Sequence, residues 1–239
     1  MIKIEKVTKK FAEKVAVDDL SLTVERGEIF AFLGPNGAGT TTTIKMMVGL
    51  LRPTSGRISL GGHDVIADYV EAKRMVGYIP DEPYLYDKLS GREFLEFVAS
   101  IFQLEPEKAR RSAAQLIEKF SMGDYIESLT EEYSHGMKQR LVIASCLLHE
   151  PQIIIVDEPM VGLDPASTRL VKDVFRERSR AGVTIFMSTH TLPVAEELAG
   201  RIGIILNGSL RALGSRGEIS ALAASPGTFE DAFLKLTSE

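Results

Sequence analysis

The sequence contains one cysteine, no tryptophan and no long apolar run. A single cysteine cannot form an internal disulfide, and Cys146 lies in an apolar helical stretch where burial is its expected role. No run approaches the roughly 20 apolar residues of a membrane-spanning helix, and the first residues lack the apolar segment of a signal peptide. These absences predict a chain that stays in the cytoplasm.

An excess of positive charge is also absent. The formal net charge is -5 over 239 residues, which disfavours nucleic acid as a partner. With 44% hydrophobic residues, the chain is long enough to form one compact unit of one or two lobes with a substantial core.

The hydrophobic patterns predict an α/β fold. Residues 1–28 alternate between apolar and polar, which is typical of half-buried antiparallel strands. The apolar runs at 29–33, 153–156 and 183–187 predict buried strands of a parallel sheet with helices between them. From about 81 to 150 the period is helical, so we expect a helical subdomain inserted into a core made of residues 1–80 and 151–212. A C-terminal extension then covers about 213–239.

Particular helices and turns follow from shorter signals. The stretch from Arg92 to Leu104 predicts a helix with one apolar face, formed by Phe94, Phe97, Val98, Ile101 and Phe102. Asn207-Gly208 predicts a hairpin. Thr228 and Asp231 have capping-box spacing ahead of a final helix striped by Phe229, Ala232, Phe233 and Leu236.

A glycine-rich loop follows the apolar run at 29–33. Its residues are Gly34, Pro35, Asn36, Gly37, Ala38, Gly39, Thr40, Thr41 and Thr42. The spacing follows the phosphate-binding pattern GxxxxGK[ST], with threonine at position 40 in place of lysine. Backbone N–H groups and the positive end of the next helix would bind phosphates, and the Thr41 hydroxyl is placed for Mg²⁺. The loop predicts a P-loop NTPase core of the RecA-like kind; a glycine-rich turn without phosphate is the alternative.

Two acids, Asp157 and Glu158, directly follow the apolar run at 153–156. In a parallel α/β sheet, ligands bind at the carboxyl ends of the strands. Asp157 therefore suits Mg²⁺ bound to nucleotide phosphates, and Glu158 suits the water that attacks the terminal phosphate. His190 ends the next strand and is expected at the same edge, within reach of a phosphate oxygen. A solvated strand end is the alternative for these groups.

Phe11 lies at the turn between the first two strands. An aromatic ring there could hold a flat ligand, and a packed core phenylalanine is the other interpretation.

A further motif, Tyr133-Ser134-His135-Gly136-Met137, precedes the apolar helix 141–148. A serine hydroxyl and backbone N–H groups at a helix N-terminus can bind a phosphate. With the motifs from Phe11 to His190 in this order, the chain resembles the ATP-binding subunit of an ATP-binding cassette (ABC) transporter over nearly its whole length. The resemblance implies a single ATP-binding domain, residues 1–239, that uses ATP and Mg²⁺.

The resemblance also implies a role for each motif. Phe11 would stack on adenine, the loop 34–42 would bind the phosphates, and the metal would be bound by Thr41, Asp81 and Asp157. Glu158 would be the catalytic carboxylate and His190 the switch histidine. A signature motif would cap the ATP of a second subunit, through Ser134, His135, Gly136 and Met137. A dimer loop, Val161 to Asp164, would contact that subunit, with Gly162, Leu163 and Asp164 as its site residues.

Several positions depart from the family pattern. The signature, usually LSGGQ, keeps only Ser134 and one glycine, and this variant resembles exporters, as does the tail from Phe229 to Leu234. Asp81 stands where the family usually has the glutamine that links Mg²⁺ to the membrane subunit. The resemblance implies two partners: a second ATP-binding subunit, identical or different, and a transmembrane permease that fixes the chain to the inner face of the membrane. Tyr84, Tyr86, Leu89 and Phe94 would form the apolar hollow for a short permease helix.

Among these departures, Thr40 is the one expected to affect the mechanism most. The missing lysine would make a charge-assisted contact of about 1.5–3 kcal/mol with the phosphates, and removing such a charge costs about 10²–10³ in rate. Lys45 lies more than a turn further along the helix and cannot replace it. We therefore expect weak ATP binding and poor hydrolysis. The other motifs are intact and one base change converts a lysine codon to threonine, which favours an introduced substitution over a natural inactive partner.

Two other classes of protein fit part of the pattern. One is a cytosolic ATPase of the same fold that acts in DNA repair or translation; such proteins usually carry long coiled coils or tandem cassettes. The other is a non-hydrolysing regulatory ATP-binding module, which Thr40 alone supports.

Overall fold

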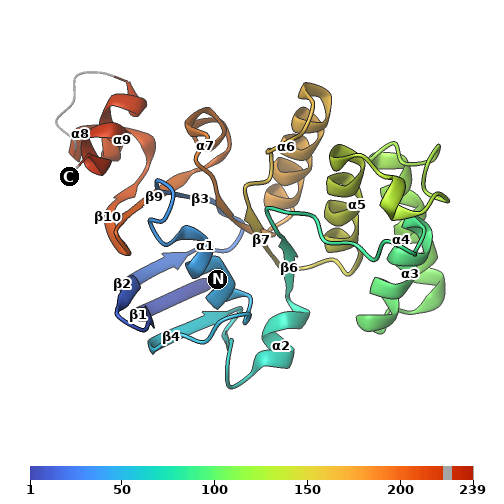
Figure 1. The fold of residues 1–239 in the computed structure, drawn as a ribbon, viewed down its shortest axis with the longest axis horizontal. Helices are drawn as coiled ribbons and strands as arrows, with labels where there is room; N and C mark the ends of the chain where they lie inside the picture. Colours follow the sequence, from blue (N-terminus) through green and yellow to red (C-terminus); the bar gives the residue numbers. More distant parts are fainter. Residues whose placement is uncertain (223–227, 239) are drawn as a thin grey trace.

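The computed structural model describes residues 1–222 and 228–238. The N-terminal part is an antiparallel sheet with the strand order β2-β1-β4-β5 (Figure 1). Its strands are β1 (Ile2–Phe11), β2 (Lys14–Val24), β4 (Ser55–Leu60) and β5 (His63–Asp64). Ile2 and Ile4 are buried while Lys3 and Glu5 are exposed, so the alternation in the sequence marks one buried face as predicted.

A second sheet of six strands forms the centre of the molecule, in the order β10-β9-β3-β8-β7-β6. Its strands are β3 (Ile29–Leu33), β6 (Val76–Ile79), β7 (Ile153–Asp157), β8 (Thr184–Ser188), β9 (Arg201–Leu206) and β10 (Ser209–Gly214). The pairings of β6, β7, β8, β3 and β9 are parallel, and β10 returns antiparallel to β9. β3, β7 and β8 are buried along their whole length, as their continuous apolar runs predict.

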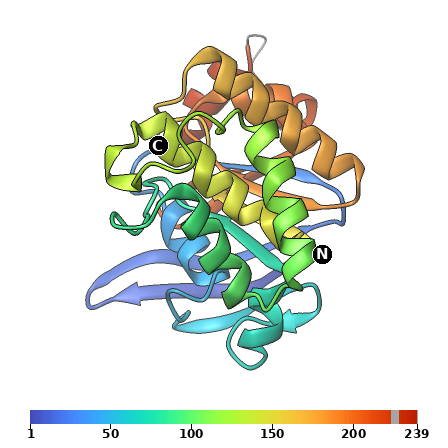
Figure 2. The same ribbon diagram turned by 90° about the vertical axis from the view of Figure 1, so that its right-hand side faces the viewer.

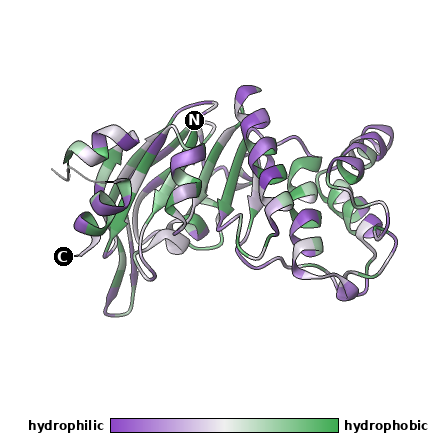
Figure 3. Ribbon diagram, turned by 90° about the horizontal axis from the view of Figure 1, so that it is seen from above, coloured by the Kyte–Doolittle hydropathy of each residue, from purple (hydrophilic) through white to green (hydrophobic). Residues whose placement is uncertain are grey.

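Helices cover the sheets and end the chain. They are α1 (Thr40–Met47), α2 (Tyr69–Arg74), α6 (Pro165–Arg180), α7 (Leu192–Leu198), α8 (Arg216–Leu222) and α9 (Phe229–Thr237). Hydrophobic residues are concentrated on the strands and on the inner sides of the helices (Figure 3). The predicted capping box of Thr228 and Asp231 begins α9, and residues 223–227 of the predicted extension lie outside the described residues. Within the described residues, no helix combines the length and apolarity that crossing a bilayer requires.

A helical lobe is inserted between β6 and β7 and projects from one side of the sheets (Figures 1 and 2). It consists of α3 (Gly91–Ile101), α4 (Pro106–Lys119), the 3-10 turn η1 (Thr130–Glu132) and α5 (His135–Leu148). α5 packs against both α3 and α4, and its far end contacts β6. Together with the two sheets, this lobe confirms the predicted α/β class with an antiparallel subdomain and a helical part.

The predicted apolar face of α3 is partly wrong. The buried residues are Gly91, Phe94, Leu95 and Ala99, whereas Phe97 and Ile101 are 39% and 59% exposed. Leu95 and Ala99 lie toward the lobe interior at i+1 and i+5 from Phe94, so the buried stripe is rotated from the one that large side chains suggest. Phe97 and Ile101 remain as apolar side chains on the outer surface.

Candidate nucleotide site

The predicted site residues follow three adjacent strands. Phe32 of β3 pairs with Ser188 of β8, and Ser188 pairs with Asp157 of β7. The strands are parallel, so the glycine-rich loop, the two acids and His190 all leave the sheet at its carboxyl edge. The structure thereby brings together the three motifs that the sequence separates by up to 156 positions, from Gly34 to His190.

Three positions of the loop require glycine, each for a different physical reason. Gly37 has a φ of 82° and open space around it, so the backbone conformation itself requires glycine. Gly39 has a φ of 113°, and a Cβ there would lie 2.6 Å from the Ala16 carbonyl oxygen. Gly34 lies against β9, where a Cβ would be 2.7 Å from the Ile205 carbonyl oxygen. The loop can adopt this close turn because these positions lack side chains.

The N-terminus of α1 has the features of an anion-binding site. Gly39 is its N-cap, and among the described residues no side chain caps the helix and no acid lies in its first turn. The first N–H groups of a helix carry a partial positive charge and lack intrahelical partners. Thr41 exposes its side chain at this end, next to Thr40 and Thr42. These features fit a phosphate group.

A cavity of about 220 Å³ connects the loop to the tip of the first hairpin. It is lined by Phe11, Lys14, Ala16, Gly37, Gly39, Thr40, Thr41 and Thr42. Phe11 is 43% exposed, so the interpretation as a packed core residue is wrong. The Lys9 ammonium lies 4.9 Å from the ring centroid, so a flat ligand would meet Phe11 on a surface that already carries a cation.

Lys14 was missed by sequence reasoning. It pairs with Phe11 at the start of β2, and of the described residues that line this cavity it alone is charged. The signal that could have found it is its position directly opposite Phe11 across a tight turn. Lys45, by contrast, is exposed on α1 and does not line the cavity, as the helix geometry predicts.

Asp157 is buried, with 4% exposure, and its Oδ1 accepts a hydrogen bond from the Ser188 hydroxyl. This contact excludes a solvated strand end for Asp157. Ser188, which the sequence reasoning did not select, orients the carboxylate from the neighbouring strand.

Glu158 and His190 are in direct contact. Glu158 Oε1 accepts the His190 backbone N–H at 2.9 Å and lies 2.8 Å from His190 Nδ1, while Oε2 accepts the Thr189 hydroxyl at 3.2 Å. Glu158 also has a positive φ of 48°, which is uncommon for a residue with a side chain. The backbone therefore turns sharply after β7 and directs this carboxylate toward β8.

The signature motif lies apart from the loop of its own chain. Ser134 is the N-cap of α5, and its side chain accepts the Met137 N–H at 3.3 Å. His135 and Gly136 follow in the first turn of the helix; a Cβ on Gly136 would meet nothing within 4 Å. His135 lines a polar hollow with Val161 of the dimer loop and Asp81, and none of the signature residues lines the cavity at Phe11.

Asp81 follows closely after the end of β6, and its negative charge acts on the nearby phenol of Tyr78. Burial, with smaller contributions from the charges of Asp157 and Asp81, raises the pKa of Tyr78 to about 12. Tyr78 therefore remains a neutral phenol between the acids of β7 and the start of the helical lobe.

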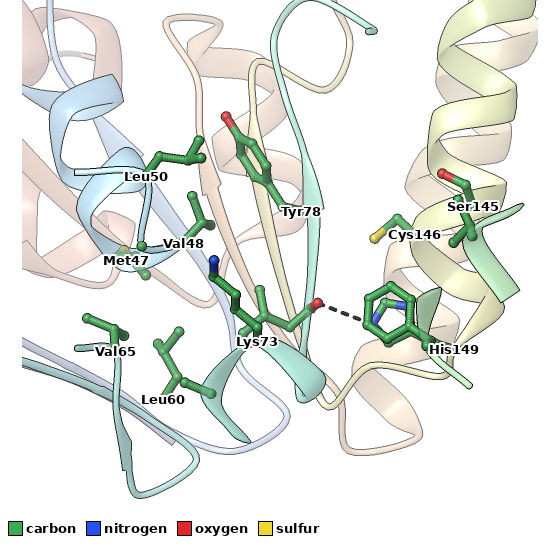
Figure 4. A pocket seen from close by; sticks show the side chains of 15 residues that line it. Met47, Val48, Leu50, Leu60, Val65, Lys73, Tyr78, Ser145, Cys146 and His149 are labelled. Carbon is green, nitrogen blue, oxygen red and sulfur yellow. Dashed lines mark hydrogen bonds between the residues drawn. The ribbon is translucent and has the colours of Figure 1, made fainter. Parts of the chain in front are cut away.

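A second cavity of about 330 Å³ lies at the seam between core and helical lobe (Figure 4). The core contributes the end of α1, α2 and β6, including Leu50, Lys73 and Tyr78, and the lobe contributes Val98 and Phe102 with Ser145, Cys146 and His149. His149 stacks on Phe102 with the ring centroids 3.7 Å apart, and its Nε2 lies 3.1 Å from the Val76 carbonyl oxygen. The end of α5 is thus joined to β6.

The predicted hollow of Tyr84, Tyr86, Leu89 and Phe94 lies on the outer side of this lobe. Tyr84 and Tyr86 are 77% and 47% exposed, and Tyr86 packs edge-on against Phe97 with centroids 5.2 Å apart. Phe94 is buried beneath them, 6.3 Å from the Tyr86 ring. The region presents exposed aromatic rings continuous with the outer face of α3.

The parallel sheet, the glycine loop before an uncapped helix and the acids at the end of β7 define the P-loop class of nucleotide-binding proteins. The ABC transporter family pattern matches residues 17–161. Among curated relatives, the ABC transporter ATP-binding protein YhcH of Bacillus subtilis is 39% identical over 88% of this chain and 68% of its own. The linearmycin resistance ATP-binding protein LnrL of Bacillus subtilis is 34% identical over 92% of this chain and 70% of its own.

A solved ATP-binding subunit of an ABC transporter superposes with a TM-score of 0.94 at 30% identity, covering 99% of both chains. The chain belongs to the ABC transporter family, whose ATP-binding domains are ATPases. ATP-binding subunits of this family dimerise and pair with transmembrane permeases.

Proposed function

We propose that this chain, as a single domain of residues 1–239, is the ATP-binding and ATP-hydrolysing subunit that powers an exporter. The observation that carries the proposal is the convergence of the glycine loop, the pair Asp157 and Glu158, and His190 at one edge of the sheet. Export is supported by the variant signature motif and by the likeness to a relative named for antibiotic resistance.

The proposal gives each of these residues a role in binding or hydrolysing ATP at the carboxyl edge of the sheet. Phe11 receives the adenine ring, and residues 34–42 bind the phosphates through their backbone N–H groups and the end of α1. Glu158 holds the attacking water, and His190 contacts the terminal phosphate while bonded to Glu158. The buried carboxylate of Asp157, fixed by Ser188, and the Thr41 hydroxyl would hold Mg²⁺, which neutralises phosphate charge when bound. Asp81 would be an outer metal partner.

Thr40 impairs this site in our proposal. It faces the cavity where the family has lysine, so the phosphates there lose a charge-assisted contact of about 1.5–3 kcal/mol. The charge matters most as the reaction proceeds, and its loss lowers the rate by about 10²–10³. The remaining groups of the site are present, which separates this defect from general loss of function.

A second cassette completes the site. The N-terminus of α5, with the Ser134 hydroxyl and the open side of Gly136, offers hydrogen-bond donors to a phosphate but lies apart from the loop of its own chain. We assign it, with His135 and Met137, to the ATP of the partner cassette. Gly162, Leu163 and Asp164 then contact that partner.

The permease docks on the helical lobe and fixes the chain to the inner face of the membrane. The seam cavity and the exposed rings of Tyr84, Tyr86 and Phe97 offer apolar surface for a short helix. A permease helix bound at the seam would contact both the lobe and β6. Asp81 follows closely after β6 in the chain. Docking of the permease is therefore coupled to the carboxyl edge of the sheet, where the nucleotide binds.

Affinity capture from detergent-solubilised membranes of the source organism tests this function. The chain should retain a polytopic membrane protein, and Val98→Glu, which places a charge at the seam cavity, should lose it. Lys119→Ala on α4, away from the seam, is the matched control. Retention of ribosomes or DNA instead would support a soluble ATPase of the same fold and contradict the proposal.

The regulatory module is the second candidate, because Thr40 occupies the position of the family lysine. It requires ATP binding at equilibrium without turnover even in the Thr40→Lys variant. The intact contacts of Glu158 with His190 and Thr189 favour hydrolysis instead.

A further inference from the structure

Phe11 lies at the tip of the first hairpin, where the sheet supports it least. The register of β1 with β4 runs from Ile2 to Thr8, and beyond Thr8 the strand pairs with β2. The pairing with β2 is irregular near the tip, with register shifts on both sides of Lys9. Such shifts disrupt the ladder of backbone hydrogen bonds. The position of the Phe11 ring therefore depends on contacts made by side chains.

Lys9 makes two such contacts. Its ammonium lies over the Phe11 ring, 4.9 Å from the ring centroid. The same Nζ donates a hydrogen bond to the Arg52 carbonyl oxygen at 2.8 Å. A cation over the face of an aromatic ring is attracted by the negative charge of that face. Lys9 therefore ties the Phe11 ring to the segment that connects α1 with β4.

The two faces of the Phe11 ring have different surroundings. Phe11 lines the cavity beside the glycine loop, and Lys9 does not line it. The ring therefore lies between the Lys9 ammonium and the cavity. The 43% exposure of Phe11 fits a ring with one covered face and one open face. A base that enters the cavity would stack on the open face and leave the contact with the cation intact.

The segment that accepts the Lys9 hydrogen bond starts from the helix at the phosphate loop. α1 begins at Thr40, which lines the cavity, and the chain runs from the end of α1 through Arg52 and Thr54 to β4. The Thr54 N–H donates to the Thr8 carbonyl oxygen at 2.8 Å, and the Thr54 hydroxyl accepts the Lys10 N–H at 3.0 Å. These bonds set the strand that carries the ring relative to α1.

We propose that Lys9 is a positioning residue for the base of the nucleotide, which holds the Phe11 ring at a fixed place relative to the N-terminus of α1. The inference rests on the proposed function, in which Phe11 receives the adenine ring. A ring that is held before the base arrives loses less freedom on binding. Since the ring separates the Lys9 ammonium from the cavity, binding of the base should depend on Lys9 and binding of the phosphates should not.

The first test compares ATP with inorganic tripolyphosphate, which has a chain of phosphates and no base. Calorimetric titration with Mg²⁺ measures the dissociation constant of each ligand in the full chain carrying Thr40→Lys. Adding Lys9→Met, which keeps an apolar stem and removes the ammonium, should raise the constant for ATP about 2- to 5-fold and leave that for tripolyphosphate unchanged. Lys9→Arg should retain the affinity for ATP, because a guanidinium makes the same kind of contact with the ring.

Lys10→Met is the matched control. Lys10 is exposed, and its bond to Thr54 comes from the backbone N–H, so the substitution removes a neighbouring charge and keeps that bond. The affinity for ATP should stay the same. Unchanged ATP affinity in Lys9→Met overturns the inference, and so does equal weakening of both ligands by Lys9→Met and Lys10→Met. A chain that binds neither ligand contradicts the proposed function instead.

The second test observes the ring directly and needs no nucleotide. In the full chain labelled with carbon-13 phenylalanine, the magnetic resonance signals of Phe11 are those lost in Phe11→Leu. Lys9→Met should shift these signals because the ammonium lies over the ring, and Lys10→Met should leave them in place. Signals that do not move in Lys9→Met overturn the inference, whatever the chain binds.

Discussion

In the proposed site, single side chains should determine how well phosphate binds. Because Thr40 is neutral, Lys14 supplies the positive charge among the described residues that line the cavity beside the loop. We expect Lys14→Met to weaken ATP binding by about 10-fold or more, since a hydrogen bond to a charged group contributes about 1.5–3 kcal/mol. Equilibrium binding of a fluorescent ATP analogue measures the change.

Lys45→Met is the matched control for this experiment. Lys45 is exposed on α1 and does not line the cavity, so its loss should leave the dissociation constant nearly unchanged. Equal weakening by both substitutions would show that general surface charge, and not the position of Lys14, attracts the nucleotide.

His149 makes stability depend on pH. Its burial lowers the pKa of the imidazole below the ordinary value, although the bond to the Val76 carbonyl opposes the shift. As pH falls below about 6.5, the unfolded chain takes up the proton first, so the free energy of unfolding decreases until the lower folded pKa is passed. The full contribution of the neutral ring is present above that pH.

Urea unfolding of the chain and of His149→Gln at pH 8 and pH 5.5 measures this effect. The chain should lose more stability than the variant between the two values. Parallel losses would contradict the assignment of a neutral buried imidazole at the seam.

At the scale of elements, the type and order of strands and helices could be predicted well from local signals. The apolar run at 153–156 and the capping box of Thr228 and Asp231 are local signals, and the structure has β7 and the start of α9 at these positions. The face of α3 could not be predicted, because size alone favoured Phe97 and Ile101 while the neighbouring helices select Leu95 and Ala99. Which side of a helix is buried depends on packing partners that are distant in sequence.

In the candidate site, too, some residues could be predicted from local sequence and others depend on contacts between distant segments. The glycine loop, Asp157, Glu158 and His190 follow sequence patterns whose chemistry is local. Ser188, which orients Asp157, and Lys14, which enters the cavity, act through pairing between strands. Their roles required the register of the sheets, which no single stretch of sequence contains.

The contact between β6 and α5 gives a prediction for stability. A Cβ on Gly77 would lie 2.3 Å from Cys146 Sγ and 3.1 Å from the Cys146 carbonyl oxygen. Gly77→Ala should therefore lower the free energy of unfolding by about 1–3 kcal/mol, as overpacking of a core does. Denaturant unfolding measures the change.

Two further variants sharpen that experiment. Gly123→Ala adds a methyl group where nothing lies within 4 Å and should change stability by no more than about 0.5 kcal/mol. Adding Cys146→Ala to Gly77→Ala should cost less than the sum of the single changes, since the sulfur that clashes is gone. Additive losses would place the strain elsewhere.

At the scale of the whole molecule, the proposed function assigns two surfaces to two partners. In the proposed function, the carboxyl edge of the sheet and the start of α5 are each half of an ATP site, and the apolar seam between core and lobe binds a membrane protein. Closing two cassettes around ATP would move both lobes together with their docked helices. The proposed function therefore predicts that the energy of ATP is transmitted through α5, which reaches from its N-cap Ser134 to His149 at the seam.

The most direct measurement is phosphate release from ATP by the chain, by Thr40→Lys, and by Thr40→Lys combined with Glu158→Gln. We predict that lysine at position 40 raises turnover by about 10²–10³ and that the Glu158→Gln change removes the gain, because the site lacks one charge and depends on one carboxylate. Turnover that stays at the level of the unmodified chain while ATP remains bound would contradict the account.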